Sequence, residues 1–238
     1  MERSVTQTNK KKIFLEILED LKGKLNVGTL QAGDKLPSER SMAEQLGVSR
    51  ASVREAIRAL EIIGLLHCVQ GDGNYLVDDL RDSLVEPIAF MFALSGGDIM
   101  TALNLREALE LKTAELAAAA CTTADAAELR HLLERLDSGS CELDRAEVDM
   151  ELHYRIANMA GNPLILSTLN AASSLVETII KGIRIAIMNE ATRVTQIDRQ
   201  HRELVEAIIS GDPQFAQIKM KEHMALITEY TVRIADIN

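Results

Sequence analysis

Cysteine is scarce in this chain of 238 residues, and the three cysteines form no pattern. Cys68, Cys121 and Cys141 show no CxxC spacing, and their number is odd. These features argue against a disulfide framework and against a zinc site built from cysteines. We therefore expect the three cysteines to act as small apolar fillers.

Long apolar runs are missing as well. No stretch approaches the roughly 20 residues that a membrane-spanning helix requires, and the N-terminal segment is polar, unlike a signal peptide. No internal repeat is visible either. The sequence therefore predicts a cytoplasmic protein that makes no contact with a membrane.

Strand patterns are nearly absent beyond Val77, where long helical periodicity takes over. We predict a mainly α chain with two domains. Residues 1–78 are expected to form a winged helix-turn-helix with three helices and a β-hairpin wing. Residues 79–238 are expected to form an all-α bundle of six to seven helices, with the polar segment 78–82 as a hinge.

Caps and breaks divide the predicted bundle into helices. Asp98 and Thr123 are expected to cap helix N-termini, because their side chains can accept hydrogen bonds from free backbone amides. The segments Gly161–Pro163 and Ser210–Pro213 each combine a glycine that can end one helix with a proline that suits the first turn of the next.

Charge is divided unevenly between the two predicted domains. Residues 1–78 hold eleven basic and eleven acidic residues, so the whole formal net charge of −10 belongs to the remainder. The acidic bundle is not expected to bind nucleic acid. The segment from Lys35 to Arg58 holds five basic against three acidic side chains and can meet an anionic partner.

The segment 36–57 indicates two short helices broken at Gly47. Ser49 can accept a hydrogen bond from the first free amides of the second helix, and Gly64 can end that helix in a left-handed conformation. Two short helices joined in this way are typical of a helix-turn-helix that meets a DNA groove.

The second of these helices has an apolar face and a basic face. The apolar positions, which recur at helical spacing, are Val53, Ile57 and Leu60. Arg50 and Arg54 are left on the other surface, one turn apart, where each can pair with a guanine or a phosphate. The alternative is a solvated helix face on which Glu55 and Glu61 neutralise the arginines.

A β-hairpin is predicted directly after this helix. Leu65–Val69 is a short apolar run, Gly71–Gly73 is a tight turn, and Tyr75–Val77 can return as a second strand. A helix pair followed by a hairpin is a winged helix-turn-helix, which favours DNA binding as the role of the arginines.

The residues from Gly33 to Arg40, from Gly47 to Ala56 and in the glycine turn of the wing resemble the GntR family of bacterial transcription regulators, in its FadR-like branch. The resemblance implies a homodimer that binds palindromic half-sites of double-stranded DNA. The residues that we predict to bind DNA are Arg40, Ser49, Arg50, Ser52, Arg54, Gly71 and Gly73. Many members of the family have a basic residue or glycine between the wing glycines, whereas this chain has Asp72, whose charge would repel phosphate.

Three histidines and an aspartate occupy positions that a helical bundle can bring together. His201 precedes Asp212 by eleven residues and His223 follows it by eleven, so their imidazoles fall at the same height in an antiparallel helix pair. Asp149 and His153 are one turn apart on another helix, which is a metal-ligand spacing. Such a set suits Zn²⁺, with Ni²⁺, Mn²⁺ and Fe²⁺ as alternatives. Each histidine taken singly is also compatible with a hydrogen-bonded core residue.

The second domain resembles the FCD ligand-binding domain of the same regulators. The segment from Asp149 to Pro163 carries the pattern of that domain. Many members hold a metal with an aspartate and three histidines in this order, and the matching residues are Asp149, His153, His201 and His223. The resemblance implies that a small-molecule effector binds in this domain.

An effector that is a small organic carboxylate would need a second cation beside the metal. Arg106 is the predicted partner, because a guanidinium pairs with a carboxylate through two hydrogen bonds; its alternative role is an ion pair with Glu110. Asn170 lies about as far after the Asn162 break as His153 lies before it. Asn170 is therefore predicted to face the same chamber, or else to cap a neighbouring backbone group.

Together these features predict a transcription regulator, a repressor and not an enzyme, whose operator affinity depends on an organic acid bound at a metal site. Two alternatives stay open. The metal can be purely structural and stabilise a dimerisation element. It can also activate water in a His/Asp metalloenzyme, although the ligands' neighbours, such as Leu152 and Met224, are mainly apolar and offer no general base.

Overall fold

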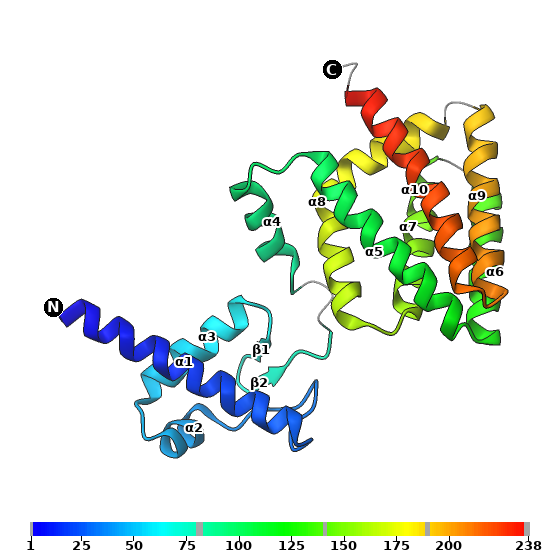
Figure 1. Ribbon diagram of the computed structural model, residues 1–238. Coiled ribbons are helices and arrows are strands. Elements are labelled where there is room, and N and C mark those ends of the chain that lie inside the picture. The colour runs from blue at the N-terminus through cyan, green and yellow to red at the C-terminus, as the bar shows by residue number, and fades with distance from the viewer. Residues whose placement is uncertain (1, 80–82, 140–141, 189–190, 236–238) are drawn as a thin grey trace. The chain divides into compact units, whose positions relative to one another are not determined.

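The structure is a computed structural model that describes residues 2–79, 83–139, 142–188 and 191–235. The chain divides into two compact units, Met1–Pro87 and Ile88–Asn238 (Figure 1). Each unit has a hydrophobic core of its own. Residues 80–82 of the predicted hinge lie outside the described residues.

The first unit consists of three helices followed by a two-stranded sheet (Figure 1). The elements are α1 (Glu2–Asn26), α2 (Glu39–Leu46), α3 (Arg50–Ile62), β1 (Leu66–Val69) and β2 (Gly73–Leu76). All five elements contribute side chains to one core, whose most buried members include Ile17, Val53, Ile57 and Leu60. The predicted winged helix-turn-helix is confirmed.

Local caps fix the ends of α2 and α3. The Ser38 hydroxyl accepts a hydrogen bond from the backbone N–H of Ser41 at 3.2 Å, and the Ser49 hydroxyl accepts one from that of Ser52 at 3.1 Å. Gly47 between the helices has a φ of 63°, in the left-handed region that residues with a side chain rarely adopt. The predicted break at Gly47 and cap at Ser49 are confirmed.

The wing is an antiparallel hairpin, in which Val69 pairs with Gly73. The segment before α2 is hydrogen-bonded to the second strand, since the N–H of Leu36 donates to the carbonyl of Asn74 at 2.8 Å. This bond ties the wing to the entrance of α2, so the hairpin lies beside the helix pair.

Beyond the hinge, the described part of the chain contains seven helices, in agreement with the predicted six to seven. They are α4 (Val85–Leu94), α5 (Ile99–Ala120), α6 (Thr123–Ser138), α7 (Glu142–Met159), α8 (Pro163–Met188), α9 (Ala191–Ile209) and α10 (Pro213–Ala235). In the second unit, α5 is central and packs against α7, α8, α9 and α10 (Figure 1). Among the helices described, none combines the length and the apolar character that crossing a membrane requires.

Helices α8 and α10 begin directly after the predicted breaks, each with a proline as its first residue. Oδ1 of Asn162 accepts hydrogen bonds from the backbone N–H groups of Leu164 at 3.1 Å and Ile165 at 3.2 Å. Oδ1 of Asp212 accepts one from the N–H of Phe215 at 2.9 Å. Both predicted breaks are thus real helix boundaries, with side-chain caps.

One predicted cap is wrong by a single residue. Helix α6 is capped by Thr122 and not by Thr123, because Thr122 and Asp125 form a reciprocal capping box. Thr123 could not form such a box, since the residue three positions later is Ala126, which has no acceptor. Asp98 caps α5 as predicted.

Of the two cysteines that the structure describes, only one acts as an apolar filler. Cys121 is half-buried and packs against the core of the second unit. Cys68 is exposed, contrary to expectation, because only Leu66 of β1 is buried in the core. Cys141 lies outside the described residues.

Candidate functional site

The arginines predicted to bind DNA lie near the starts of α2 and α3 and are exposed. Nε of Arg40 donates to Oε1 of Glu44 at 2.9 Å, and Nε of Arg54 donates to Oε2 of Glu39 at 3.1 Å. Arg50 forms no ion pair within the described residues. If the arginines merely formed a solvated helix face, Glu55 and Glu61 were expected as their partners, whereas the partners observed are Glu44 and Glu39. Exposed pairs of this kind contribute little stability, so the guanidinium groups can exchange them for phosphates.

A shallow hollow of about 560 Å³ lies between the start of α3 and the wing. It brings together four predicted DNA-binding residues, which are Arg40, Arg50, Gly71 and Gly73. The two predicted serines, Ser49 and Ser52, lie at the N-terminus of α3 with their hydroxyl oxygens 2.8 Å apart. The predicted DNA-binding residues at the hollow therefore come from the helix pair and from the wing.

Asp72, which departs from the family pattern, is held by two partners in the first unit. The ammonium group of Lys35 donates to its Oδ1 at 2.5 Å, and the hydroxyl group of Tyr75 donates to its Oδ2. These hydrogen bonds keep the pKa of Asp72 below its ordinary value, and the bond from Lys35 has the larger effect. The charge of Lys35 offsets that of Asp72, which reduces the expected repulsion of phosphate.

In the second unit, one aspartate and three histidines form a buried cluster. Asp149 and His153 lie on α7, His201 lies on α9, and His223 lies on α10. One possible ligand atom of each residue lies within 4.8 Å of those of the other three. Nε2 of His153 is 3.1 Å from Nε2 of His223, and Nε2 of His201 is 2.8 Å from Oδ1 of Asp149. The structure thus brings together the four residues that the sequence singled out.

This donor set fits a divalent metal ion. Two atoms that each lie about 2 Å from one ion are separated by roughly 3 to 4 Å, close to the distances observed. Nε2 of His201 lies 2.8 Å from Oδ1 of Asp149 but makes no bond of hydrogen-bond geometry within the described residues, and Nδ1 of His201 and of His223 are also buried without a partner there. Unsatisfied buried polar atoms are costly, and coordination would satisfy Nε2 of His201. The cluster can therefore hold a metal.

Burial also keeps His223 in the form that coordinates metals. It lowers the pKa of His223 well below 6.5, and the imidazoles of His201 and His153 lower it further. Asp149 and Glu110 raise the pKa but do not compensate. His223 is therefore neutral at pH 7 in the folded protein, with a nitrogen lone pair available to a metal.

We expect the metal-free protein to lose stability in acid. Because the folded-state pKa of His223 is depressed, the unfolded chain binds more protons at pH values between that pKa and 6.5. The free energy of unfolding therefore rises with pH in this window and falls as the pH drops below 6.5, by at most about 1.4 kcal/mol per pH unit.

Thermal unfolding with a chelator present, from about pH 7.5 to about pH 5, measures this loss. The His223→Gln variant should lose less stability over the range than the wild type. His131 is exposed on α6, so His131→Gln should behave like the wild type. If His223→Gln loses as much stability in acid as the wild type, His223 is not the group responsible for the loss.

Arg106 and Glu110 lie one turn apart on α5 and are 4% and 1% exposed. Nε of Arg106 donates to Oε1 of Glu110 at 2.7 Å, and Nη2 lies 2.6 Å from the same oxygen. Oε2 of Glu110 is hydrogen-bonded to Nδ1 of His153. Burial raises the pKa of Glu110, but the charge of Arg106 and the interaction with His153, which includes a hydrogen bond, outweigh burial and hold the pKa well below its ordinary range. Arg106 therefore makes the ion pair that was its alternative role, using one edge of its guanidinium group.

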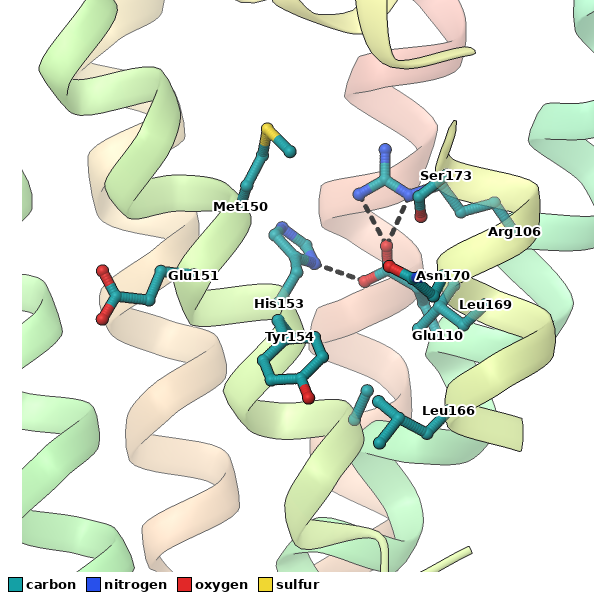
Figure 2. Close-up of a pocket in the computed structure, with 11 residues that line it drawn as sticks. Arg106, Glu110, Met150, Glu151, His153, Tyr154, Leu166, Leu169, Asn170 and Ser173 are labelled. Carbon is teal, nitrogen blue, oxygen red and sulfur yellow. Dashed lines mark hydrogen bonds and ion pairs between the residues drawn. The ribbon is translucent and has the colours of Figure 1, made fainter. Parts of the chain in front are cut away.

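A cavity of about 270 Å³ lies beside these three residues, with walls from α5, α7 and α8 (Figure 2). Arg106, Glu110 and His153 line it together with Asn170 of α8, and the third nitrogen of Arg106 points away from Glu110 (Figure 2). Most of the lining is apolar and includes Met150, Ala157, Leu166 and Leu169. Both predicted effector residues therefore share one cavity with a residue of the metal cluster.

Glu110, Tyr154 and Ser173 also line this cavity, although the sequence did not single them out as site residues. For Glu110 a signal existed, because it follows Arg106 by four residues and therefore lies on the same helix face. For Tyr154 and Ser173 we find no such signal, since their places depend on how α7 and α8 pack.

Two protein families match the chain, one in each unit. Residues 14–76 match the family described as bacterial regulatory proteins, gntR family, and residues 101–226 match the FCD domain. The first match covers the helix pair and the wing. The second includes the four residues of the metal cluster together with Arg106 and Asn170.

Among similar proteins, the HTH-type transcriptional regulator LutR of Bacillus subtilis is 30% identical over 204 residues, which are 85% of this chain and 93% of LutR. The putative L-lactate dehydrogenase operon regulatory protein of Escherichia coli is 28% identical over 216 residues, or 89% of this chain and 83% of that protein. The solved structure of Streptococcus agalactiae GntR is 23% identical, with a TM-score of 0.65, and the match covers 92% of this chain and 98% of that one. This last likeness shows a common fold.

Proposed function

Because the chain belongs to the gntR family of bacterial regulatory proteins and is a DNA-binding transcription regulator with an FCD domain, we propose that it is a repressor controlled by a small organic carboxylate. The effector would bind in the cavity of the second unit, beside a divalent metal ion. The observation that carries this proposal is the position of His153, which belongs to the buried Asp/His cluster and also lines the cavity that holds Arg106. The metalloenzyme alternative is not retained, since the family and the relatives are transcription regulators.

The metal would be held by Asp149, His153, His201 and His223. Zinc is the proposed ion, because three imidazoles and one carboxylate are donors of the kind that zinc prefers. When bound, it would supply a fixed positive charge next to the cavity. The four buried side chains would provide a preformed site, in which His223 needs no deprotonation before it coordinates.

The effector's carboxylate would pair with Arg106. Glu110 occupies the edge of the guanidinium formed by Nε and Nη2, which leaves Nη1 and the second hydrogen of Nη2 for an anion. Asn170 of α8, which lines the same cavity, can add a hydrogen bond. A volume of about 270 Å³ with mainly apolar walls suits a small acid with an apolar body better than a sugar acid.

Regulation would work through a homodimer, in which the two α3 helices enter the major groove at half-sites roughly 34 Å apart. Arg50 and Arg54 would contact bases or phosphates there, and the hollow beside the wing would receive the backbone. The effector can shift this equilibrium only if it binds the DNA-competent and DNA-incompetent states with different affinity. A coupling of about 1 to 3 kcal/mol is enough for a useful response.

We expect a small carboxylate to raise the melting temperature of the zinc-loaded protein. A ligand at 100 times its dissociation constant stabilises by about 2.7 kcal/mol, which corresponds to roughly 5 to 11 °C for a chain of this size. Arg106→Lys keeps a cation for Glu110 but loses the planar fork, so the carboxylate affinity should drop at least about tenfold. A thermal-shift screen of small acids, followed by titration of operator DNA with the hit, measures both effects.

The control for this screen is Arg130→Lys, which changes an exposed arginine of α6 in the same way. A shift of undiminished size in Arg106→Lys would remove Arg106 from the effector site. Tighter operator binding with the hit would contradict the repressor assignment. If no acid produces a shift while zinc stays bound, the metal is structural, an alternative that the burial of all four donors favours.

A further inference from the structure

A single buried carboxylate contacts both halves of the proposed site. Glu110 binds Arg106 through Oε1 and His153 through Oε2 (Figure 2). The side chain is 1% exposed, so water does not compete for either oxygen. The two bonds therefore set the orientation of both partners.

The bond to His153 has a chemical consequence at the opposite side of the imidazole ring. A carboxylate accepts a hydrogen bond and cannot donate one, so Nδ1 of His153 must carry the proton that it shares with Glu110. In the neutral ring, the lone pair is then on Nε2. That atom is the one that faces the cluster, at 3.1 Å from Nε2 of His223 and 4.0 Å from Oδ1 of Asp149.

We propose that Glu110 is a positioning residue for the metal site, which selects the tautomer of His153 that can coordinate and fixes the direction of its ring. Arg106 supports this role from the other oxygen, because its bond to Oε1 holds the carboxylate with Oε2 toward His153. The proposal rests on the proposed function in assuming that the cluster binds a metal. It adds that the metal affinity depends on Glu110, a residue that is not one of the four ligands.

Glu110→Gln is the sharpest test, because glutamine has the same shape but can offer His153 only one of two unsuitable arrangements. If the amide nitrogen faces Nδ1, it donates a hydrogen bond and drives the histidine proton onto Nε2. If the amide oxygen faces Nδ1, the amide nitrogen must face the donors of Arg106. Only the first arrangement keeps both hydrogen bonds, and it leaves the histidine proton on Nε2, the nitrogen that should coordinate; the second loses the bond to Arg106.

Zinc affinity is measured on the full-length protein by competition with a chromophoric chelator. Because loss of a hydrogen-bond partner of a metal ligand weakens metal binding, we expect Glu110→Gln to lower the zinc affinity by about 10- to 100-fold. Glu115→Gln is the matched control, since Glu115 lies on the same helix and bonds Lys112 far from the cluster. The control should bind zinc like the wild type.

A double variant keeps the test valid if Glu110→Gln leaves Arg106 unpaired and does not fold. Arg106→Leu/Glu110→Leu removes both charges together and leaves Nδ1 of His153 without an acceptor, so it should show a loss of zinc affinity of the same order. The tautomer is read separately in the metal-free protein, by long-range ¹⁵N–¹H correlation of the histidine rings. We expect a proton on Nδ1 of His153 in the wild type and on Nε2 in the folded glutamine variant.

The outcomes separate this inference from the proposed function. A wild type that binds zinc, together with Glu110→Gln and double leucine variants that bind it equally well, overturns the role of Glu110 alone. A wild type that binds no zinc overturns the metal part of the proposed function and this inference with it. Reduced affinity with a changed tautomer supports both.

Discussion

Removal of the metal should lower the melting temperature of the protein by roughly 8 to 16 °C. A metal present at 1,000 times its dissociation constant stabilises the folded state by about 4.1 kcal/mol, and each kcal/mol shifts the melting temperature of a chain of this size by about 2 to 4 °C. The physical reason is the buried cluster, in which His201 and His223 have nitrogens without hydrogen-bond partners within the described residues. Without the ion, these atoms remain desolvated and unsatisfied.

Differential scanning calorimetry of the zinc-loaded protein, with and without a chelator, measures this effect. His201→Ala should melt near the chelated wild type and should not respond to zinc. His131→Ala removes an exposed histidine and should keep the full response. A zinc-loaded wild type that melts at the same temperature after chelation would rule out a stabilising metal in this cluster.

Replacement of Arg50 or Arg54 by alanine should weaken operator binding by about 1 to 3 kcal/mol each, or roughly 5- to 150-fold. Both guanidinium groups stand on the exposed face at the start of α3. Arg50 forms no ion pair within the described residues and can meet DNA without losing a partner. Arg54 must first leave Glu39, an exchange that costs little because the Arg54 side chain is 51% exposed.

Fluorescence anisotropy with operator and with unrelated DNA, at several salt concentrations, assigns the type of contact. A loss confined to the operator indicates a contact to a base. A uniform loss, with the salt slope reduced by about one, indicates a contact to a phosphate. Arg130→Ala removes the same charge from α6 and should bind DNA like the wild type. Full operator affinity in both Arg50→Ala and Arg54→Ala would show that α3 is not the recognition helix.

Much of the fold could be predicted because its signals are local. Ser49, Gly47 and Asp212 act on backbone groups within four residues of themselves, so the sequence is enough to place the helix ends. The error at Thr122 arose at the same scale, between two adjacent threonines that differ only in the residue three positions later.

The buried cluster of Asp149 and three histidines was predictable from the sequence for a related reason. His201 and His223 are equally far from Asp212 in the sequence. Because the chain turns tightly there, the two residues lie at the same level of the antiparallel helices α9 and α10, with their ring centroids 4.6 Å apart. The pair Asp149 and His153 follows from the periodicity of one helix. The four candidate ligands lie on three helices. Their prediction needed only these two local patterns and the expectation that the bundle brings α7 close to the α9–α10 pair.

The sequence by itself thus determined the elements, their caps, the basic start of α3 and the two halves of the cluster, because periodicity and capping act over a few residues. Only the tertiary structure decided which groups meet across elements. It set Lys35 against Asp72, gave Glu110 two partners, and put Asn170 in the same cavity as Arg106. Such contacts depend on how far each helix is rotated about its axis, and that rotation is fixed by the packing of the whole core and by no single segment.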